Sequence, residues 1–479
     1  PPHAISASAT SPLAGIQATM MRKTTLCALA VLAAATLVSS HAHSPGLDED
    51  HHGAGAHSSA EFAPIPLVEF PPNDGPDPWT AKYAGVAKPA YAGVNTYAHL
   101  PTAKCLSDPD QMFDVAVLGI PYDLTVTYRP GARFGPHAIR QASRRQRAGR
   151  TFSLHHMQDP YSTGLRFLDC DDVPTSGFDP ALAIDQIEAA YTSLLQRVPA
   201  SDPSVGPAGG DPTPPESAVS SEAWSAFSNA GLAHDARAHP KIVSMGGDHT
   251  IVLPILRSLH RIYGPIAVIH FDAHLDTWPP EVSPAGSPTR QHQIQHGTFF
   301  WQAALEGLIA RNQSIHAGIR TRLGSYDDIE HDASIGFDII TSDDLDDLGI
   351  PAIINNIRAR VGSMPVYLSI DIDTLDPGFA PGTGTLESAG WSPRELRRIL
   401  RGLEGLNFVG FDLVEVSPAY DQAEITAYAA SDLIYEFMNL LTRGNSLQDK
   451  GKVAQPKAKA RKTAKSPLGS LFGGAKDEL

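Results

Sequence analysis

Clusters of acidic and histidine residues follow short hydrophobic runs in the middle of this chain of 479 residues. There are four such clusters, and in chain order they are GGDHT (246–250), HFDAHLDTW (270–278), QHGTFF (295–300) and SIDIDTLDP (369–377). Strand-like runs precede three of them, namely IVSM, IAVIHF and VYLSI. Alternate residues of a strand point to the same face, so each D-x-H-x-D or D-x-D sequence directs its side chains to one point at the end of its strand. This pattern favours a fold in which ligands gather at strand ends.

Strand-like and helix-like segments alternate along most of the chain, which predicts an α/β protein. The expected strands are 115–120, 241–245, 266–271, 314–320, 337–345, 366–371 and 408–416. The expected helices are 181–198, 302–311, 352–361, 393–404 and 423–441. Alternation at this spacing predicts a central parallel sheet with helices on both faces. Ligands in such folds collect at the carboxyl ends of the strands, which is where the clusters lie.

The N-terminal part of the chain differs in composition from the middle. Residues 1–42 are expected to be an extension followed by a secretory signal peptide. The peptide has a basic start after Met21, an apolar stretch and a cleavage site with small residues. Residues 1–19 precede the first methionine, which indicates that the gene model begins upstream of the true start of translation. Residues 43–79 are rich in His, Gly and Pro, and we expect them to form a disordered leader.

Residues 80–442 are expected to form the globular domain, with a surface insertion at about 199–221 that is rich in Pro, Gly, Ser and Asp. A basic run at 140–150 is expected to form a solvated helix face. Residues 443–479 form a basic tail, expected to be disordered, that ends in Lys-Asp-Glu-Leu, an address for return to the endoplasmic reticulum. Together with the signal peptide, this ending predicts residence in the lumen, or secretion if the address is not read.

The composition is that of a soluble globular enzyme, with 42% hydrophobic and 19% charged residues. The net charge of −15 argues against nucleic acid or an anionic membrane as a partner and fits a small cationic substrate. The three cysteines include no zinc-type pair. Signal cleavage would leave Cys105 and Cys170, which could pair in an oxidising lumen if their Cα atoms are close enough. The sequence Asn312-Gln313-Ser314 is a glycosylation sequon.

Carboxylate and imidazole side chains in the clusters predict a metal centre. Taken singly, each motif has a plain structural reading, since a lone D-x-D is often a capped turn and Asp248 could cap a helix. Together they supply six candidate ligands: His249, Asp272, His274, Asp276, Asp371 and Asp373. This mixture suits a divalent ion such as manganese better than a thiolate-bound zinc. Six ligands are too many for one tetrahedral site and about right for two bridged ions roughly 3.5–4 Å apart.

Asp272 and Asp371 are expected to bridge the two ions, because each opens its cluster at a strand end. His249 and Asp276 would complete the coordination of one ion, and Asp276 is also expected to take part in catalysis. His274 and Asp373 would complete the other ion.

Two further residues are candidates for the reaction itself. His296 lies outside the ligand alternation and could pass a proton to a leaving amine; the alternative is an ordinary surface histidine. Glu415 follows another apolar strand and has no evident partner in the sequence, so a cationic substrate group could supply one. The alternative for Glu415 is a helix-capping or solvated carboxylate.

Four segments resemble the sequences of agmatinases, which belong with arginases to the ureohydrolase family. They are LGIPYDLTVTYRPGARFGPHAIRQAS (118–143), HGTFF (296–300), APGTGTLE (380–387) and EVSPAYDQAEIT (415–426). The resemblance extends from about residue 115 to 441. It implies an arginase-like, three-layer α/β/α fold and two Mn²⁺ ions per subunit on the six positions above. It also implies proton transfer by His296, guanidinium binding by Glu415, and assembly as a homo-trimer or homo-hexamer.

The resemblance leaves three functions open. The first expectation is manganese-dependent hydrolysis of agmatine to putrescine and urea. The second is a guanidinobutyrase or another hydrolase of ω-guanidino acids, because Arg290, in a loop that contacts the substrate tail in the family, could meet a carboxylate. The third is a non-catalytic luminal binding protein on the same fold. The chain also departs from the agmatinase pattern at Leu386 and Ser388, where the family usually has Pro.

Overall fold

The computed structural model describes residues 77–83, 89–203, 219, 224, 227–280 and 293–442. The chain divides into two units, 1–85 and 86–479. The short helix α2 (Pro78–Tyr83) belongs to the first unit, and the other elements of the described residues belong to the second. The predicted signal peptide, Arg290 and the C-terminal address lie outside the described residues.

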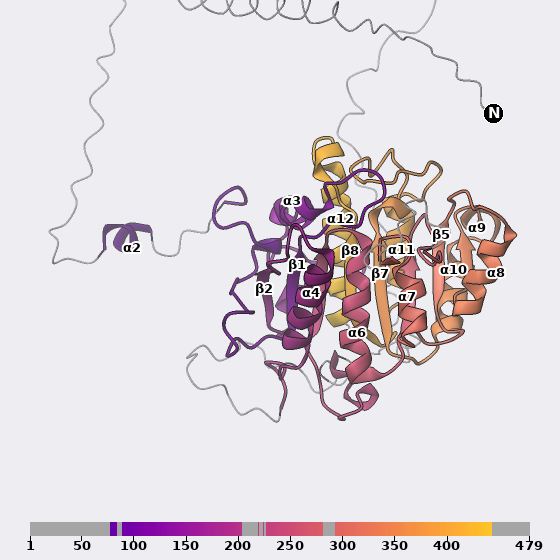
Figure 1. The fold of residues 1–479 in the computed structure, drawn as a ribbon. Helices are drawn as coiled ribbons and strands as arrows, with labels where there is room; N and C mark the ends of the chain where they lie inside the picture. The colour runs from indigo at the N-terminus through magenta and orange to yellow at the C-terminus, as the bar shows by residue number, and fades with distance from the viewer. Residues whose placement is uncertain are drawn as a thin grey trace, which may run out of the picture. The chain divides into compact units, whose positions relative to one another are not determined.

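A central sheet of eight parallel strands organises the second unit (Figure 1). The strands are β1 (Val115–Ile120), β2 (Phe167–Asp172), β3 (Lys241–Gly246), β4 (Ala267–Phe271), β5 (Ile315–Ile319), β6 (Ile339–Thr341), β7 (Val366–Asp371) and β8 (Phe408–Val414). Their order across the sheet is β2-β1-β3-β8-β7-β4-β5-β6, and every pairing is parallel.

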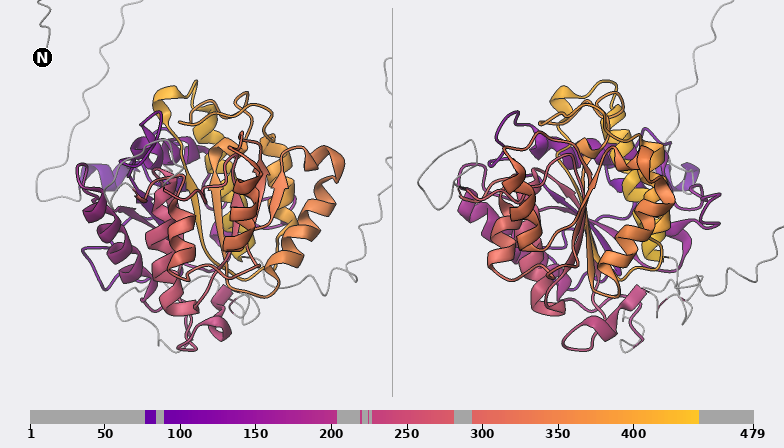
Figure 2. Two further views of the ribbon diagram at one scale, coloured as in Figure 1. Left: turned by 45° about the vertical axis from the view of Figure 1, so that its right-hand side comes forward. Right: turned by 90° about the vertical axis from the view of Figure 1, so that its right-hand side faces the viewer.

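Helices cover both faces of the sheet, as the edge-on view in Figure 2 shows. One layer contains α4 (Pro180–Leu195), α6 (Val252–Tyr263) and α7 (Phe299–Leu305). The other layer contains α3 (Gly135–Ala142), α10 (Ile350–Val361), α11 (Pro393–Gly402) and α12 (Ile425–Thr442). Two short helices, α8 (Tyr326–Ile335) and α9 (Asp344–Asp347), lie beside the β6 edge. Each face of the sheet has its own hydrophobic core, and the three-layer α/β/α prediction is confirmed.

The strand order brings the sequence clusters together. After β3 the chain passes over two places in the sheet to form β4, and β7 and β8 later fill the gap. The four central strands are therefore β3, β8, β7 and β4, which end at the GGDH sequence, Glu415, the D-x-D sequence and the D-x-H-x-D sequence. Because the strands are parallel, these four ends lie at one edge of the sheet.

Several element boundaries differ from the sequence prediction. The helix expected at 302–311 begins earlier and ends at Leu305, because Gly307 takes a positive φ of 73° and Ile309 then pairs with Ile266 beside β4. The strand expected at 337–345 is limited to β6, since Asp344 begins α9. β2, with the acidic sequence FLDCDD, was not predicted, because an edge strand of this composition lacks the hydrophobic run that marks the others.

The basic run at 140–150 is solvated only in part: Arg145 and Arg150 are exposed, but the prediction was wrong for Arg140 and Arg144, which are buried. Arg140 is 5% exposed and forms two hydrogen bonds of 2.9 Å to Asp169 and one of 2.6 Å to Asp172. Arg144 donates to the carbonyl oxygens of Ala90 and Ala92. The partners of these arginines lie in segments distant in sequence, so helical periodicity alone could not reveal them.

A disulfide joins Cys105 to Cys170 of β2, with a Cα–Cα distance of 5.1 Å. This settles the pairing that the sequence left open. Asn312 of the sequon is exposed. Among the described residues, no helix combines the length and the apolar character that a membrane crossing requires.

Candidate metal centre and active site

The turn after β3 places His249 over the ends of the central strands. Gly247 is required there, because a Cβ atom would lie 1.8 Å from the carbonyl oxygen of Tyr122. Asp248 accepts hydrogen bonds from the Thr250 amide (3.0 Å) and the Thr125 hydroxyl (2.7 Å), so it shapes the turn as its capping alternative predicted. His249 is 1% exposed and is the residue of this turn that enters the cluster.

The loops after β4 and β7 are shaped by their own carboxylates. Asp272 accepts a bond from the His274 amide (2.6 Å), and Asp371 accepts one from the Asp373 amide (2.8 Å). Asp373 in turn accepts a bond from the Ala273 amide (3.1 Å), which links the two loops. These bonds keep the alternating side chains directed toward the shared edge of the sheet.

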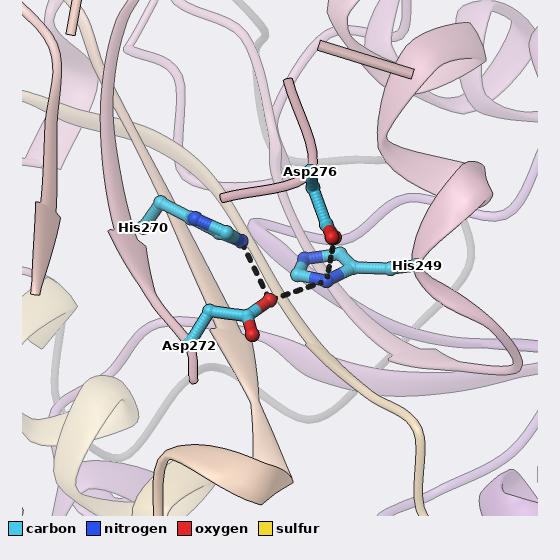
Figure 3. Close-up of side chains that lie close together, drawn as sticks. All are labelled: His249, His270, Asp272 and Asp276. Atoms are coloured by element: carbon cyan, nitrogen blue, oxygen red, sulfur yellow. Dashed lines mark ion pairs between the residues drawn. The ribbon is translucent and has the colours of Figure 1, made fainter. Parts of the chain in front are cut away.

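The six predicted ligands form two groups that share Asp272. In the first group His249 Nδ1 lies 3.1 Å from Asp272 Oδ2 and 3.1 Å from Asp276 Oδ2 (Figure 3). It also lies 3.4 Å from Asp371 Oδ2. In the second group His274 Nδ1 lies 3.3 Å from Asp272 Oδ1 and 3.1 Å from Asp373 Oδ2. The structure therefore brings the six residues together, with His249 beside Asp276 and His274 beside Asp373. Of the two carboxylates expected to bridge, Asp272 lies near both histidines, whereas Asp371 lies near His249.

Two observations indicate that this cluster fits divalent cations. His249 Nδ1 and Asp272 Oδ2 are buried and form no hydrogen bond within the described part of the chain. Burial, followed by the charge of Asp272, raises the pKa of Asp276 to about 6. Burial and the charges of Asp373 and Asp272 also raise the pKa of Asp371 well above its usual range. Such a group of buried carboxylates is unfavourable alone and would be stabilised by metal ions.

A chain of hydrogen bonds sets the orientation of His249. Ser369 donates to Asp412 (2.8 Å), so the serine oxygen is the acceptor for His249 Nε2, which lies 2.8 Å away. Asp412 is held on its other oxygen by the Tyr367 hydroxyl. In the neutral ring, His249 Nδ1 is then unprotonated and faces the cluster, as a metal-ligating histidine requires. These supporting residues were not identified from the sequence.

His296 and Glu415 contact each other at the same edge of the sheet. His296 Nδ1 lies 3.0 Å from Glu415 Oε1, which also accepts a bond of 3.0 Å from the His249 amide. The Thr127 amide donates to His296 Nε2 at 2.9 Å. The sequence showed no partner for Glu415; the fold supplies these two because the end of β8 lies beside the turn after β3.

Asp276 and Glu415 both adopt the left-handed backbone region, with φ of 57° and 61°. This conformation is unfavourable for residues other than glycine, and strained residues of this kind cluster at active sites. Burial disfavours the charged ring of His296, but the bond to Glu415 and the nearby acidic charges outweigh this and raise its pKa.

A cavity of about 350 Å³ opens over the cluster. Its lining residues are Thr127, His274, Asp276, Trp278, Gln295, His296, Gly297, Arg322, Gly324, Asp371 and Thr385. Trp278 and Arg322 were not identified from the sequence. Neither belongs to a ligand alternation, and Arg322 reaches the cavity only because the loop after β5 lies beside the loop after β4.

The sequence pattern of the Arginase family matches residues 113–439. The chain belongs to this family. It is 46% identical to putative agmatinase 1 of Schizosaccharomyces pombe over 357 residues, which cover 74% of this chain and 84% of that relative. It is 35% identical to an agmatinase of Neisseria meningitidis over 331 residues, which cover 68% and 87%.

Solved structures agree with this assignment. A hypothetical agmatinase from Burkholderia thailandensis is 32% identical with a TM-score of 0.57, covering 74% of this chain and 92% of its own. Proclavaminate amidino hydrolase from Streptomyces clavuligerus is 31% identical with a TM-score of 0.60, covering 74% and 99%. This arginase-family protein is thus an agmatinase-like ureohydrolase by family, with a cluster suited to a binuclear metal site.

Proposed function

We propose that this protein is a manganese-dependent amidinohydrolase that releases urea from a guanidino compound, with agmatine as the first candidate substrate and putrescine as the second product. The observation that carries the proposal is that the six candidate ligands, His296 and Glu415 lie together at the ends of the central strands. Four of these eight residues, His274, Asp276, Asp371 and His296, line the cavity. The negative charge of this site suits a cationic substrate group. Two Mn²⁺ ions, when bound, would lower the pKa of a shared water and orient it for attack.

The protein's own groups have distinct tasks in this reaction. Both bonds to Glu415 end on Oε1, so we expect Oε2 to accept a bond from the planar guanidinium. His296 has a raised pKa and lines the cavity, so it can hold a proton near neutral pH and deliver it to the leaving amine. For that step the Thr127 amide must release Nε2, because an acceptor nitrogen cannot donate at the same time.

Arg322 favours a second candidate substrate. It is the only arginine or lysine lining the cavity, as far as the described residues show, and it is exposed. A guanidinium there would repel the distal ammonium of agmatine and attract a carboxylate. An ω-guanidino acid such as 4-guanidinobutyrate would therefore place opposite charges at the two ends of the cavity.

The test is urea release by the full chain after loading with Mn²⁺, with agmatine, 4-guanidinobutyrate and arginine as substrates. We expect urea from one of the first two and little from arginine. Arg322→Ala should lower kcat/KM for 4-guanidinobutyrate roughly tenfold, the effect of one charge-assisted bond, while leaving agmatine unchanged or improved. Urea release from none of the three by protein that retains its metal would favour the non-catalytic alternative.

We further propose that the protein is a homo-oligomer, a trimer or hexamer, in the lumen of the endoplasmic reticulum. The disulfide supports the location, because such bonds persist in oxidising compartments. The predicted signal peptide and terminal address support it independently.

A further inference from the structure

The glycosylation sequon Asn312-Gln313-Ser314 is a motif that the proposed reaction does not use. No other asparagine of the chain has Ser or Thr two positions later, so a single side chain is in question. A pattern of three residues also arises by chance. The place of the sequon in the fold therefore decides what it can do.

Asn312 lies in a turn at the amino edge of the sheet. The turn follows α7 and enters β5 at Ile315. Within it the Gln313 amide donates to the Ala310 carbonyl oxygen at 3.2 Å. Asn312 is exposed, and its φ of 57° is a left-handed value that asparagine adopts more readily than most residues. The fold thus presents this asparagine on the surface.

The amino edge lies opposite the candidate active site. β5 is parallel to the other strands, and the loop after its carboxyl end carries Arg322 to the cavity. The five residues of β5, Ile315–Ile319, span roughly 17 Å between the two edges. A bulky group on Asn312 would therefore leave the cavity open.

The serine of the sequon lies inside the folded protein, in contrast to Asn312. Ser314 is 0% exposed, and its hydroxyl accepts a bond of 3.0 Å from the Val268 amide of β4. Its carbonyl oxygen accepts bonds from the Asp338 amide (3.1 Å) and from Arg360 (3.0 Å). A transferase that recognises the whole sequon can reach Ser314 only before β5 pairs with β4.

We propose that Asn312 carries an N-linked glycan, added in the lumen before β5 pairs with β4. The side-chain amide nitrogen attacks the anomeric carbon of an oligosaccharide carried on a lipid diphosphate. A nitrogen–carbon bond forms, the carbon–oxygen bond to the diphosphate breaks, and the amide loses a proton as the lipid diphosphate leaves. Folding then buries Ser314 and leaves the glycan outside.

This inference rests on the proposed luminal location and not on the metal centre. It also bears on the proposed oligomer. An N-linked glycan is bulky and hydrated, so subunit contacts would exclude the surface around Asn312.

The first test is expression of the full chain in a eukaryotic host, followed by endoglycosidase H, which removes the glycans typical of residents of the endoplasmic reticulum. We expect the enzyme to increase the mobility of the unaltered protein on a gel and to leave Asn312→Gln unchanged. Asn355→Gln is a matched control, because Asn355 is an exposed asparagine of α10 outside any sequon. It should shift like the unaltered protein.

Peptide mass spectrometry of the unaltered protein locates the glycan even if a variant fails to fold. An unmodified Asn312 in protein whose signal peptide is removed and whose disulfide is formed would overturn the proposal.

A second test separates the modification from the location. The full chain is translated with microsomes, once with its own N-terminus and once behind an established signal peptide, and we expect a glycan in both. A glycan in the second case only would overturn luminal residence, and the inference with it. No glycan in the second case would overturn the inference alone.

The order of events is tested on folded full-length protein, purified from bacteria with its disulfide intact. We expect the transferase and its lipid-linked donor to leave this protein unmodified, because Ser314 is already buried. Modification to the same extent as in microsomes would overturn the proposed order.

Discussion

At the scale of single residues, the candidate centre concentrates negative charge where water has little access. Asp272 and Asp371 are 0% and 3% exposed. Asp272 is the carboxylate common to both groups of candidate ligands, with one oxygen near His249 and the other near His274. We therefore expect a bridging carboxylate to matter more for metal binding than any ligand of a single ion.

Replacing Asp272 or Asp371 by Ala should abolish activity and metal content together. Loss of a bridge removes a negative ligand from both ions and leaves their mutual repulsion less compensated. Elemental analysis of the purified variants checks this. Asp114→Asn is a control, because Asp114 is equally buried but lies at the amino end of β1 and bonds to the Arg166 and Ser201 amides. Two manganese ions per subunit in either Ala variant would contradict the assignment.

Glu415→Gln should separate substrate binding from metal binding. A glutamine oxygen can still accept from His296 and the His249 amide, so we expect the metal content to be unchanged. Loss of the charge that pairs with a guanidinium should lower kcat/KM by roughly 10²-fold, since charge-assisted bonds contribute about 1.5–3 kcal/mol each. Steady-state kinetics on each guanidino substrate gives the measurement. Near-normal turnover on all of them would show that the site does not bind a guanidinium through Glu415.

At the scale of elements, one buried carboxylate joins α11 to α12. Glu436 of α12 is 0% exposed and accepts bonds from Arg397 and Arg401 of α11, and from His156. Burial alone would raise the pKa of Glu436, but the bonds from His156, Arg401 and Arg397 outweigh it and lower the pKa. The resulting stabilisation is complete above the usual carboxylate pKa and is lost as the pH falls toward the lowered value.

Glu436→Gln should lower the free energy of unfolding by roughly 2 kcal/mol, because it weakens the charge-assisted bonds of the partly buried Arg397 and Arg401. Urea unfolding at neutral pH gives the value. Arg398→Ala, on the exposed side of α11, should change the stability by less than about 0.5 kcal/mol. If the two variants were equally stable at neutral pH, this contact would not be what holds α11 to α12.

At the scale of the whole molecule, the disulfide and the two predicted targeting segments at the chain ends fit the same cellular compartment. The disulfide closes a segment with a sequence separation of 65 residues, and in the chain-entropy account such a bond stabilises the fold by about 2–4 kcal/mol. A protein with such a bond keeps this stabilisation when it folds in an oxidising lumen, where the disulfide persists. The predicted targeting segments are consistent with that environment.

Deletion of the last four residues, 476–479, should move the protein from the endoplasmic reticulum to the medium, because the return address is read by a receptor at the extreme C-terminus. Immunoblotting of cells and medium measures the shift. A chain in which these residues are reordered should be secreted in the same way. A protein that stays in the cytosol with its N-terminus uncleaved and Cys105 and Cys170 reduced would contradict luminal residence.

The sequence by itself predicted most of the element types and the six candidate ligands, because both depend on short-range geometry. The spacing of Asp272, His274 and Asp276, and of Asp371 and Asp373, was enough to predict that they lie close together. In the structure the loops after β4 and β7 achieve this, because β4 ends at Phe271 and Asp373 lies in a 3-10 turn. Hydrophobic runs between helices were enough to predict a parallel sheet in three layers. These features depend on neighbours a few residues away, which a sequence displays directly.

Only the tertiary structure decided which strand ends meet and which side chains support the site. The order β3-β8-β7-β4 places Glu415 beside His249, 166 residues earlier in the chain, and brings Ser369 to the same histidine from 120 residues away. The buried pairing of Arg140 with Asp169 also depends on this arrangement. Strand order and helix packing arise from burial summed over the whole core, and no local pattern contains that sum.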